Sequence, residues 1–180
     1  MAYFISPKIL FGKGMLKRLG TELNGRGDKA LIITDKTMAL HAAPLTQALT
    51  KAGFEVEVWD GAEPEPSVQL AVEGCKVLSE YKPRWVVGFG GGSAIDTAKA
   101  SWVLYACPEL RAGELYKSVT PKARLNLRAT ASFLAVPTTS GTGSEATWAV
   151  VLTDKQMNRK IAFANNEIVP DVALLDPEFT

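Results

Sequence analysis

Histidine and cysteine are scarce in this sequence, and their scarcity limits the metal and redox chemistry open to it. The single histidine, His41, cannot form the two- or three-histidine clusters that hold most catalytic zinc and iron ions. The two cysteines, Cys75 and Cys107, stand far apart in apolar, helix-like contexts without a C-x-x-C pair. This pattern favours buried free thiols over the alternatives of a disulfide or a shared metal ion.

An excess of charge of one sign and long apolar runs are also missing. Twenty lysines and arginines balance 19 acidic residues, so there is no basic field for nucleic acid or anionic lipid. No eighteen apolar residues follow one another, and the first residues lack the pattern of a signal peptide. We therefore expect a cytoplasmic protein without nucleic-acid or membrane partners, whose 180 residues form one domain.

The stretch from Trp85 to Lys99 is the most informative part of the chain. It holds an apolar run, three consecutive glycines at 90–92, and then Ser93. The apolar run predicts a parallel strand buried on both faces, and Ser93 with Asp96 predicts a capping box at a helix start. Glycines between a strand and a helix bring backbone N–H groups close to a bound phosphate, although a purely structural turn favours the same residues. The G-x-G-x-x-G fingerprint of a first-turn dinucleotide site is absent.

A second loop of glycines and hydroxyls follows the predicted strand at 133–137. It reads Thr138-Thr139-Ser140-Gly141-Thr142-Gly143-Ser144-Glu145. Its hydroxyls could bind phosphate or ribose oxygens, or they could satisfy their own backbone, and the residues alone leave both open. Asp35 also ends a predicted strand, so it and the glycines at 90–92 can face one cleft at the carboxyl edge of a parallel sheet.

Strand and helix patterns alternate over the first hundred residues, which is typical of βαβ units. The sequence therefore predicts an α/β fold with a mainly parallel, Rossmann-like sheet and helices on both faces. Strands are expected at 29–34, 54–59 (near the sheet margin), 85–89, 133–137 and 172–175, and helices at 15–23, 36–52, 68–81 and 93–106. Also expected are a hairpin from 148–153 and 160–163, a hairpin or two short strands from 3–5 and 9–11, and a surface connection with at most a short helix over 107–130.

Two motifs taken together resemble the iron-containing, or group III, alcohol dehydrogenases. They are Gly90-Gly91-Gly92-Ser93-Ala94-Ile95-Asp96-Thr97-Ala98-Lys99 and Pro137-Thr138-Thr139-Ser140-Gly141-Thr142-Gly143-Ser144-Glu145, with Asp35 upstream and Pro170-Asp171-Val172-Ala173-Leu174-Leu175-Asp176-Pro177 downstream. The resemblance covers essentially the whole chain. It implies a dehydroquinate-synthase-like enzyme in which residues 1–180 form the nicotinamide-dinucleotide-binding α/β domain. A C-terminal helical domain, absent from this chain, would carry the metal.

The resemblance also implies which residues bind the cofactor. The pyrophosphate would be held by Gly91, Gly92 and Ser93, and the adenosine and phosphate side lined by Thr138, Thr139 and Thr142. Asp35 would contact the adenine ribose, Lys160 would reach a ribose hydroxyl, and Asp96 and Thr147 would lie toward the nicotinamide. A helix-capping role for Asp96 and a solvated surface position for Lys160 are the alternatives. No catalytic or metal-ligating residue is implied within this chain.

The implied activity is that of a metal-dependent, NAD(P)-linked alcohol dehydrogenase, which interconverts alcohols and aldehydes or ketones by hydride transfer. A carboxylate at Asp35 accepts from a ribose 2′-hydroxyl but repels a 2′-phosphate, so NAD is expected rather than NADP. Fe2+ or Zn2+ is expected in the full-length enzyme only, with a small alcohol or aldehyde as substrate and a homodimer as a compatible assembly. The alternatives are the glycerol or glycerol-phosphate dehydrogenase branch of the same fold and a stand-alone, non-catalytic nucleotide-binding module.

Overall fold

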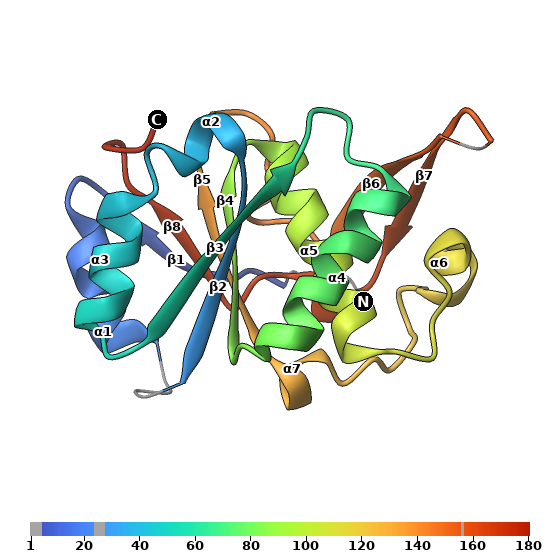
Figure 1. The fold of residues 1–180 in the computed structure, drawn as a ribbon, viewed down its shortest axis with the longest axis horizontal. Helices are drawn as coiled ribbons and strands as arrows, with labels where there is room; N and C mark the ends of the chain where they lie inside the picture. The colour runs from blue at the N-terminus through green and yellow to red at the C-terminus, as the bar shows by residue number, and fades with distance from the viewer. Residues whose placement is uncertain (1–4, 24–27, 156) are drawn as a thin grey trace.

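The computed structural model describes residues 5–23, 28–155 and 157–180. Strands and helices alternate along most of the chain (Figure 1). The strands are β1 (Lys8–Phe11), β2 (Lys29–Asp35), β3 (Glu55–Ala62), β4 (Trp85–Gly90), β5 (Ser132–Pro137), β6 (Ala149–Asp154), β7 (Arg159–Ala164) and β8 (Val172–Leu175). The α-helices are α1 (Leu19–Glu22), α2 (Lys36–Ala39), α3 (Ala43–Lys51), α4 (Val68–Tyr81), α5 (Gly92–Ala106), α6 (Leu115–Ser118) and α7 (Leu127–Thr130), and the 3₁₀ turns are η1 (Met15–Arg18), η2 (Ala112–Glu114) and η3 (Asn166–Ile168).

A six-stranded parallel sheet is the centre of the described structure. Its strands lie in the order β1-β8-β5-β4-β2-β3, and each neighbouring pair is parallel. The chain leaves β2 for β3 on one side and leaves β4 for β5 on the other, so the direction of winding reverses between β2 and β4. β6 and β7 form a separate antiparallel hairpin, as predicted. The predicted α/β class with a mainly parallel sheet is confirmed.

Helices cover both faces of the sheet and enclose two cores. Leu31 and Ile33 of β2 pack in the core that contains α4 and α5, whereas Ala30 and Ile32 pack in the core that contains α1 and α3. β4 is buried along its whole length. Burial on both faces explains why these strands are uninterrupted apolar runs in the sequence.

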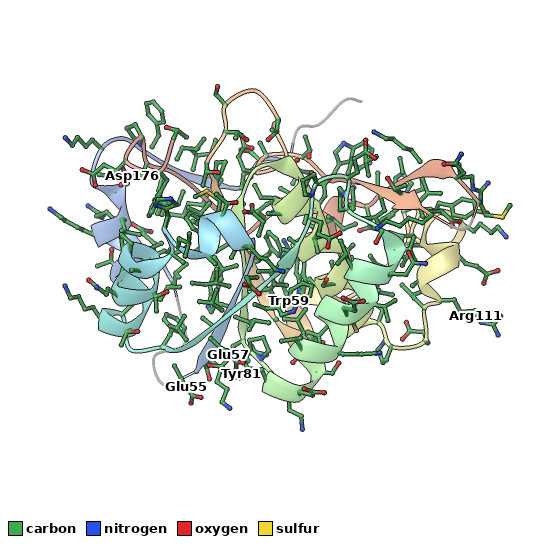
Figure 2. All side chains as sticks on the ribbon, turned by 45° about the horizontal axis from the view of Figure 1, so that its top comes forward. Glu55, Glu57, Trp59, Tyr81, Arg111 and Asp176 are labelled. Atoms are coloured by element: carbon green, nitrogen blue, oxygen red, sulfur yellow. The ribbon has the colours of Figure 1, made fainter. Side chains whose placement is uncertain are left out.

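β3 lies at the edge of the sheet, as its alternating pattern predicted. Glu55 and Glu57 are exposed on this strand, and Figure 2 shows both at the margin of the molecule. Charged side chains on an edge strand discourage pairing with a second chain, because a partner strand would have to bury them. The strand continues to Ala62 and so reaches the carboxyl edge of the sheet beside Asp35.

The predicted helix over 36–52 is interrupted. α2 ends at Ala39, Leu40 is 82% exposed, and α3 begins at Ala43 with Pro44 in its first turn. Proline has no backbone N–H to donate and its ring would clash with the carbonyl four residues earlier, so one continuous helix cannot pass this point. His41 lies exposed in the turn between the two helices.

The segment over 107–130 is more structured than the sequence predicted. It contains η2, α6 and α7 rather than at most one short helix, and Leu115 and Leu127 are fully buried in the core that contains α4 and α5. β1 pairs in parallel with β8 rather than in a hairpin, and the expected partner strand at 3–5 falls largely on residues outside the described ranges. Cys75 is half-buried and Cys107 is buried, and both are free thiols, as predicted. No helix of the described residues is long and apolar enough to cross a membrane.

Candidate nucleotide-binding site

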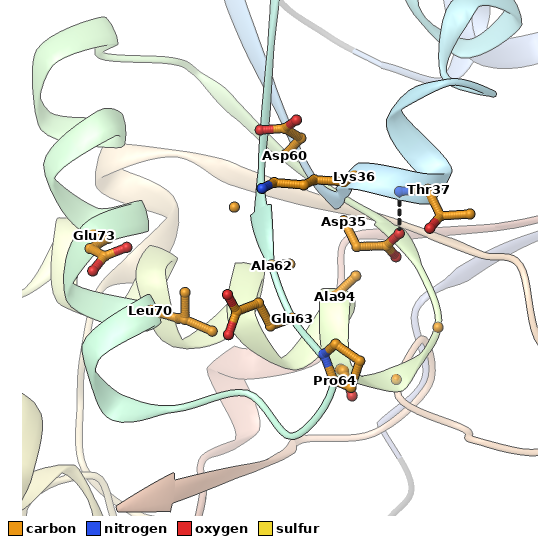
Figure 3. Close-up of a pocket in the computed structure, with 14 residues that line it drawn as sticks. Asp35, Lys36, Thr37, Asp60, Ala62, Glu63, Pro64, Leu70, Glu73 and Ala94 are labelled. Carbon is orange, nitrogen blue, oxygen red and sulfur yellow. Dashed lines mark hydrogen bonds between the residues drawn. The ribbon is translucent and has the colours of Figure 1, made fainter. Parts of the chain in front are cut away.

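A cleft of about 580 Å³ opens at the carboxyl edge of the sheet, where β2, β3 and β4 end (Figure 3). This is the point at which the winding of the sheet reverses, and loops leaving in opposite directions open a crevice there. The cleft is lined by the end of β2 and the start of α2, the end of β3 and the loop after it, one side of α4 and the first turn of α5: Asp35, Lys36, Thr37, Asp60, Gly61, Ala62, Glu63, Pro64, Leu70, Glu73, Gly91, Gly92, Ser93 and Ala94. Four predicted site residues therefore share one cleft: Asp35, Gly91, Gly92 and Ser93.

The glycine loop between β4 and α5 forms one wall of the cleft. Gly90 has a φ of 138°, which side-chain-bearing residues rarely adopt, and a Cβ there would lie 2.8 Å from the Cβ of Ala94. Gly91 is the N-cap of α5 in extended conformation, and no side chain caps the helix. The first-turn amides of a long helix thus reach the cleft without a protein side chain in place, which is the arrangement that receives phosphate groups.

The predicted capping box of Ser93 and Asp96 is wrong. The helix begins one residue earlier, at Gly92, so Ser93 lies inside the first turn and cannot act as the cap. The Asp96 side chain turns away from the helix start, and its Oδ2 accepts from the backbone N–H of Val151 at 3.1 Å. Burial raises the pKa of Asp96 above its ordinary value, although that hydrogen bond and the charge of Lys99 oppose the rise. Asp96 therefore ties α5 to the hairpin.

The segment between β5 and β6, residues 138–147, is called here the hydroxyl loop, and it packs directly against the glycine loop. The backbone N–H of Thr138 donates to the carbonyl oxygen of Gly90 at 3.0 Å, which extends the pairing of β4 with β5. A Cβ on Gly91 would lie 3.2 Å from Oγ1 of Thr139, and one on Gly92 would lie 3.3 Å from Cβ of Thr142. The two loops therefore lie side by side, and Thr138, Thr139 and Thr142 stand next to the glycines.

Asp35 has two oxygens in different situations. Its Oδ1 accepts from the backbone N–H groups of Thr37 and Met38, each at 2.9 Å, and so caps α2. Its Oδ2 would lie 3.5 Å from a Cβ placed on Gly90, so the carboxylate stands over the glycine loop. The dashed line in Figure 3 marks the bond from Thr37. The carboxylate keeps one oxygen toward the glycine loop while the other caps the helix.

Thr147 and Lys160 lie outside the lining of the cleft, as do Asp96, Thr138, Thr139 and Thr142. The carbonyl oxygen of Thr147 accepts from the Nζ of Lys99 at 2.6 Å, on the hairpin side of α5. Lys160 is exposed on β7, paired with Thr153, and does not line the cleft. The exposed position of Lys160 matches the alternative that the sequence left open.

The sequence reasoning missed the wall opposite the glycines. Asp60 lies near the end of β3, Glu63 directly follows β3, and Glu73 lies in the second turn of α4, so three more carboxylates line the cleft. The signal for Asp60 and Glu63 was their place just after the strand predicted at 54–59, the same signal that pointed to Asp35. Lys99, which was left without a role, is fully buried one turn after Asp96.

Metal-binding chemistry does not fit the residues in hand. The described part of the chain contains no group of three or more histidine, cysteine, aspartate or glutamate side chains that could hold a metal ion. Nucleotide binding does fit these residues. The glycines have no Cβ, and an added Cβ would occupy the space between the two loops, so their bare backbone is open to a ligand. The arrangement is suited to hold an anionic, sugar-bearing ligand along the carboxyl edge of the sheet.

Comparison with known proteins decides the family. A model of the iron-containing alcohol dehydrogenase family matches residues 6–177. The chain belongs to the iron-containing alcohol dehydrogenases. It is 35% identical to the NADPH-dependent butanol dehydrogenase of Clostridium saccharobutylicum over 181 residues, which cover 99% of this chain and 45% of that protein. It is 34% identical to the NAD-dependent methanol dehydrogenase of Bacillus methanolicus over 183 residues, which cover 98% and 45% respectively.

Solved structures of this family share the fold. The iron-containing alcohol dehydrogenase of Thermococcus thioreducens superposes with a TM-score of 0.85 at 35% identity, over 99% of this chain and 47% of that one. The chain therefore spans about half the length of the family members it matches. The resemblance read from the two loop motifs is confirmed at the level of family and fold.

Proposed function

We propose that this chain is the nicotinamide-dinucleotide-binding portion of an alcohol–aldehyde oxidoreductase. The observation that carries the proposal is the contact of two glycine- and hydroxyl-rich loops beside a cleft at the switch point of the sheet, within a chain of this family. When bound, the nicotinamide ring would accept hydride from an alcohol carbon or return it to an aldehyde or ketone. The substrate is a small alcohol or aldehyde, in keeping with the butanol and methanol named for the relatives.

This chain's own contribution is to bind and orient the cofactor. Gly91, Gly92 and Ser93 would present backbone N–H groups to the pyrophosphate, and Thr138, Thr139 and Thr142 would add hydroxyls from the facing loop. Asp35, which lines the cleft, would accept from the adenine ribose with the oxygen that does not cap α2. Asp96 and Thr147 would support the nicotinamide end, and Lys160 remains a proposed ribose contact from β7.

NAD is the cofactor that we propose, with NADP the weaker ligand. Asp35, Asp60, Glu63 and Glu73 line the cleft against one cation, Lys36, so a 2′-phosphate would enter an acidic surrounding. The relatives include both an NADPH-dependent and an NAD-dependent enzyme, so family membership alone leaves the choice open. The acidic lining supports NAD.

The test is a titration of NADH and NADPH by fluorescence with one glycine variant and a matched control. Gly91 has an ordinary backbone conformation, but its Cβ would meet Thr139 at 3.2 Å, so Gly91→Val should fold and lose most of its affinity for NADH. Gly113 has nothing within 4 Å of its Cβ position, so Gly113→Val should bind as the wild type does. Circular dichroism checks that both variants are folded. The proposal fails if the wild type binds neither nucleotide, or if folded Gly91→Val binds NADH unchanged.

A further inference from the structure

Lys99 is the only lysine or arginine that is fully buried in the described part of the chain. It lies on α5, and its Nζ donates to the carbonyl oxygens of Ser144 and Thr147, each at 2.6 Å. Both acceptors belong to the end of the hydroxyl loop, 45 and 48 residues further along the chain. A buried ammonium is costly unless it is paired, so these two bonds are more than incidental contacts.

Two carboxylates act on the same ammonium. Asp96 lies one turn earlier on α5, and Glu145 lies in the loop between the two carbonyl acceptors. Each has one buried oxygen without a hydrogen-bond partner, Oδ1 of Asp96 and Oε2 of Glu145. Burial lowers the pKa of Lys99 to about 8, against the attraction of these two carboxylates. The ammonium is therefore held in place from α5 and from the loop, and it neutralises charge on both.

Ser144 connects this buried cluster to the glycine loop. Its carbonyl oxygen is bound by Lys99, and its Oγ would lie 3.2 Å from a Cβ on Gly92. Thr142, two residues earlier, packs on the same glycine and accepts from the Ser144 backbone N–H at 3.4 Å. A shift of the Ser144 backbone would thus move the residues that face the first turn of α5.

We propose that Lys99 is a positioning residue for the cofactor, which holds the hydroxyl loop at a fixed distance from the glycine loop. Its ammonium binds the carbonyl oxygens of the loop, while Thr142 and the other hydroxyl-bearing residues face the ligand. The proposal rests on the proposed function, because it concerns the same dinucleotide site. It adds a residue that touches no ligand and sets the geometry of those that do.

The experiment measures NADH affinity at several pH values in four proteins: wild type, Lys99→Met, Lys99→Gln and Ser101→Ala. Lys99→Met keeps an unbranched side chain one atom shorter but leaves both loop carbonyls without their donor, so NADH affinity should fall about tenfold. Lys99→Gln offers one neutral donor group, so its NADH affinity should lie between that of the wild type and that of Lys99→Met. Ser101 is buried on the same helix and bonds only within it, so Ser101→Ala should keep wild-type affinity.

The pH profile separates positioning from plain loss of stability. Above pH 8 the wild-type ammonium loses its proton, donates more weakly and no longer offsets Asp96 and Glu145, so NADH affinity should decline between pH 7 and 9. Lys99→Met should show a flat profile over this range. If Lys99→Met fails to fold, the pH profile of the wild type alone still tests the proposal.

Each outcome bears on one proposal. A wild type that binds no nucleotide overturns the proposed function itself. A wild type that binds NADH with no change in affinity from pH 7 to 9 overturns the role of Lys99 alone. Unchanged NADH affinity in folded Lys99→Met would do the same, whereas a tenfold loss with a flat profile supports it.

Discussion

Replacement of Asp35 tests the basis of cofactor choice, provided that its two roles are separated. One oxygen caps α2 by accepting from Thr37 and Met38, and the other points toward the glycine loop. Asp35→Ala removes both, and loss of such a cap costs about 1 kcal/mol of folding free energy. Asp35→Ser removes the charge but keeps a hydroxyl that can cap the helix. The pair of variants therefore separates the charge from the cap.

The size of the charge effect follows from the surroundings of Asp35. Two unit charges about 4 Å apart repel by about 1 kcal/mol in water and about 4 kcal/mol at an effective dielectric constant of about 20. Asp35 is half-buried at an open cleft, so the lower part of this range applies. Asp60, Glu63 and Glu73 remain in the variant and continue to repel a 2′-phosphate. We expect the ratio of NADP to NAD affinity to rise about tenfold in Asp35→Ser.

Isothermal titration with NAD and NADP measures this ratio, and urea unfolding measures the cap. Asp35→Ser and Asp35→Ala should shift the affinity ratio alike, while only Asp35→Ala loses about 1 kcal/mol of stability. The reasoning is refuted if the wild type binds NADP as tightly as NAD, or if both variants leave the ratio unchanged. A shift confined to Asp35→Ala would mean that helix geometry, not charge, decides the choice.

Two further outcomes are expected. Asp176 accepts from the backbone N–H groups of Gly14, Leu16 and Glu178; burial raises its pKa, but these bonds outweigh burial and hold it below the ordinary value. Asp176→Asn should therefore lower the free energy of unfolding by about 2 kcal/mol at pH 7. This difference should shrink below pH 4, because the wild-type carboxylate gains its proton there. Urea unfolding of both proteins at each pH measures the difference. The purified chain should bind NADH yet reduce no small aldehyde when iron or zinc is added, because its described residues offer no cluster of metal ligands; turnover by the chain alone would contradict this.

The location of the candidate site could be predicted from the sequence because it depends on the backbone. The glycines at 90–92 and the loop after β5 follow uninterrupted apolar runs, and the carboxyl ends of neighbouring parallel strands must meet. The start of α5 was not predictable to the residue. Ser93 and Asp96 have the spacing of a capping box, but the helix starts one residue earlier and Asp96 accepts from Val151 of the distant hairpin instead.

The role of Lys99 needed tertiary structure for a similar reason. A lysine in an amphipathic helix is ordinarily solvent-exposed, and α5 has no polar face on which to expose it, since ten of its residues are buried. The spacing of Asp96 and Lys99 places both on one side of the helix, which was a usable signal. The acceptors were not foreseeable, because they are backbone carbonyls of a distant loop rather than side chains.

The acidic wall of the cleft adds to the preference for NAD that we propose from Asp35. Asp35 comes from β2, Asp60 from β3, Glu63 from the loop after β3, and Glu73 from α4, so only the fold brings the four carboxylates to one cleft. Each carboxylate near a 2′-phosphate makes the binding free energy of NADP less favourable, because like charges repel. The 2′-hydroxyl of NAD, in contrast, needs only one acceptor. Removal of a single carboxylate should therefore narrow the preference for NAD over NADP without reversing it. A reversal of this preference should require substitutions on β2 and also on β3 or the loop that follows it.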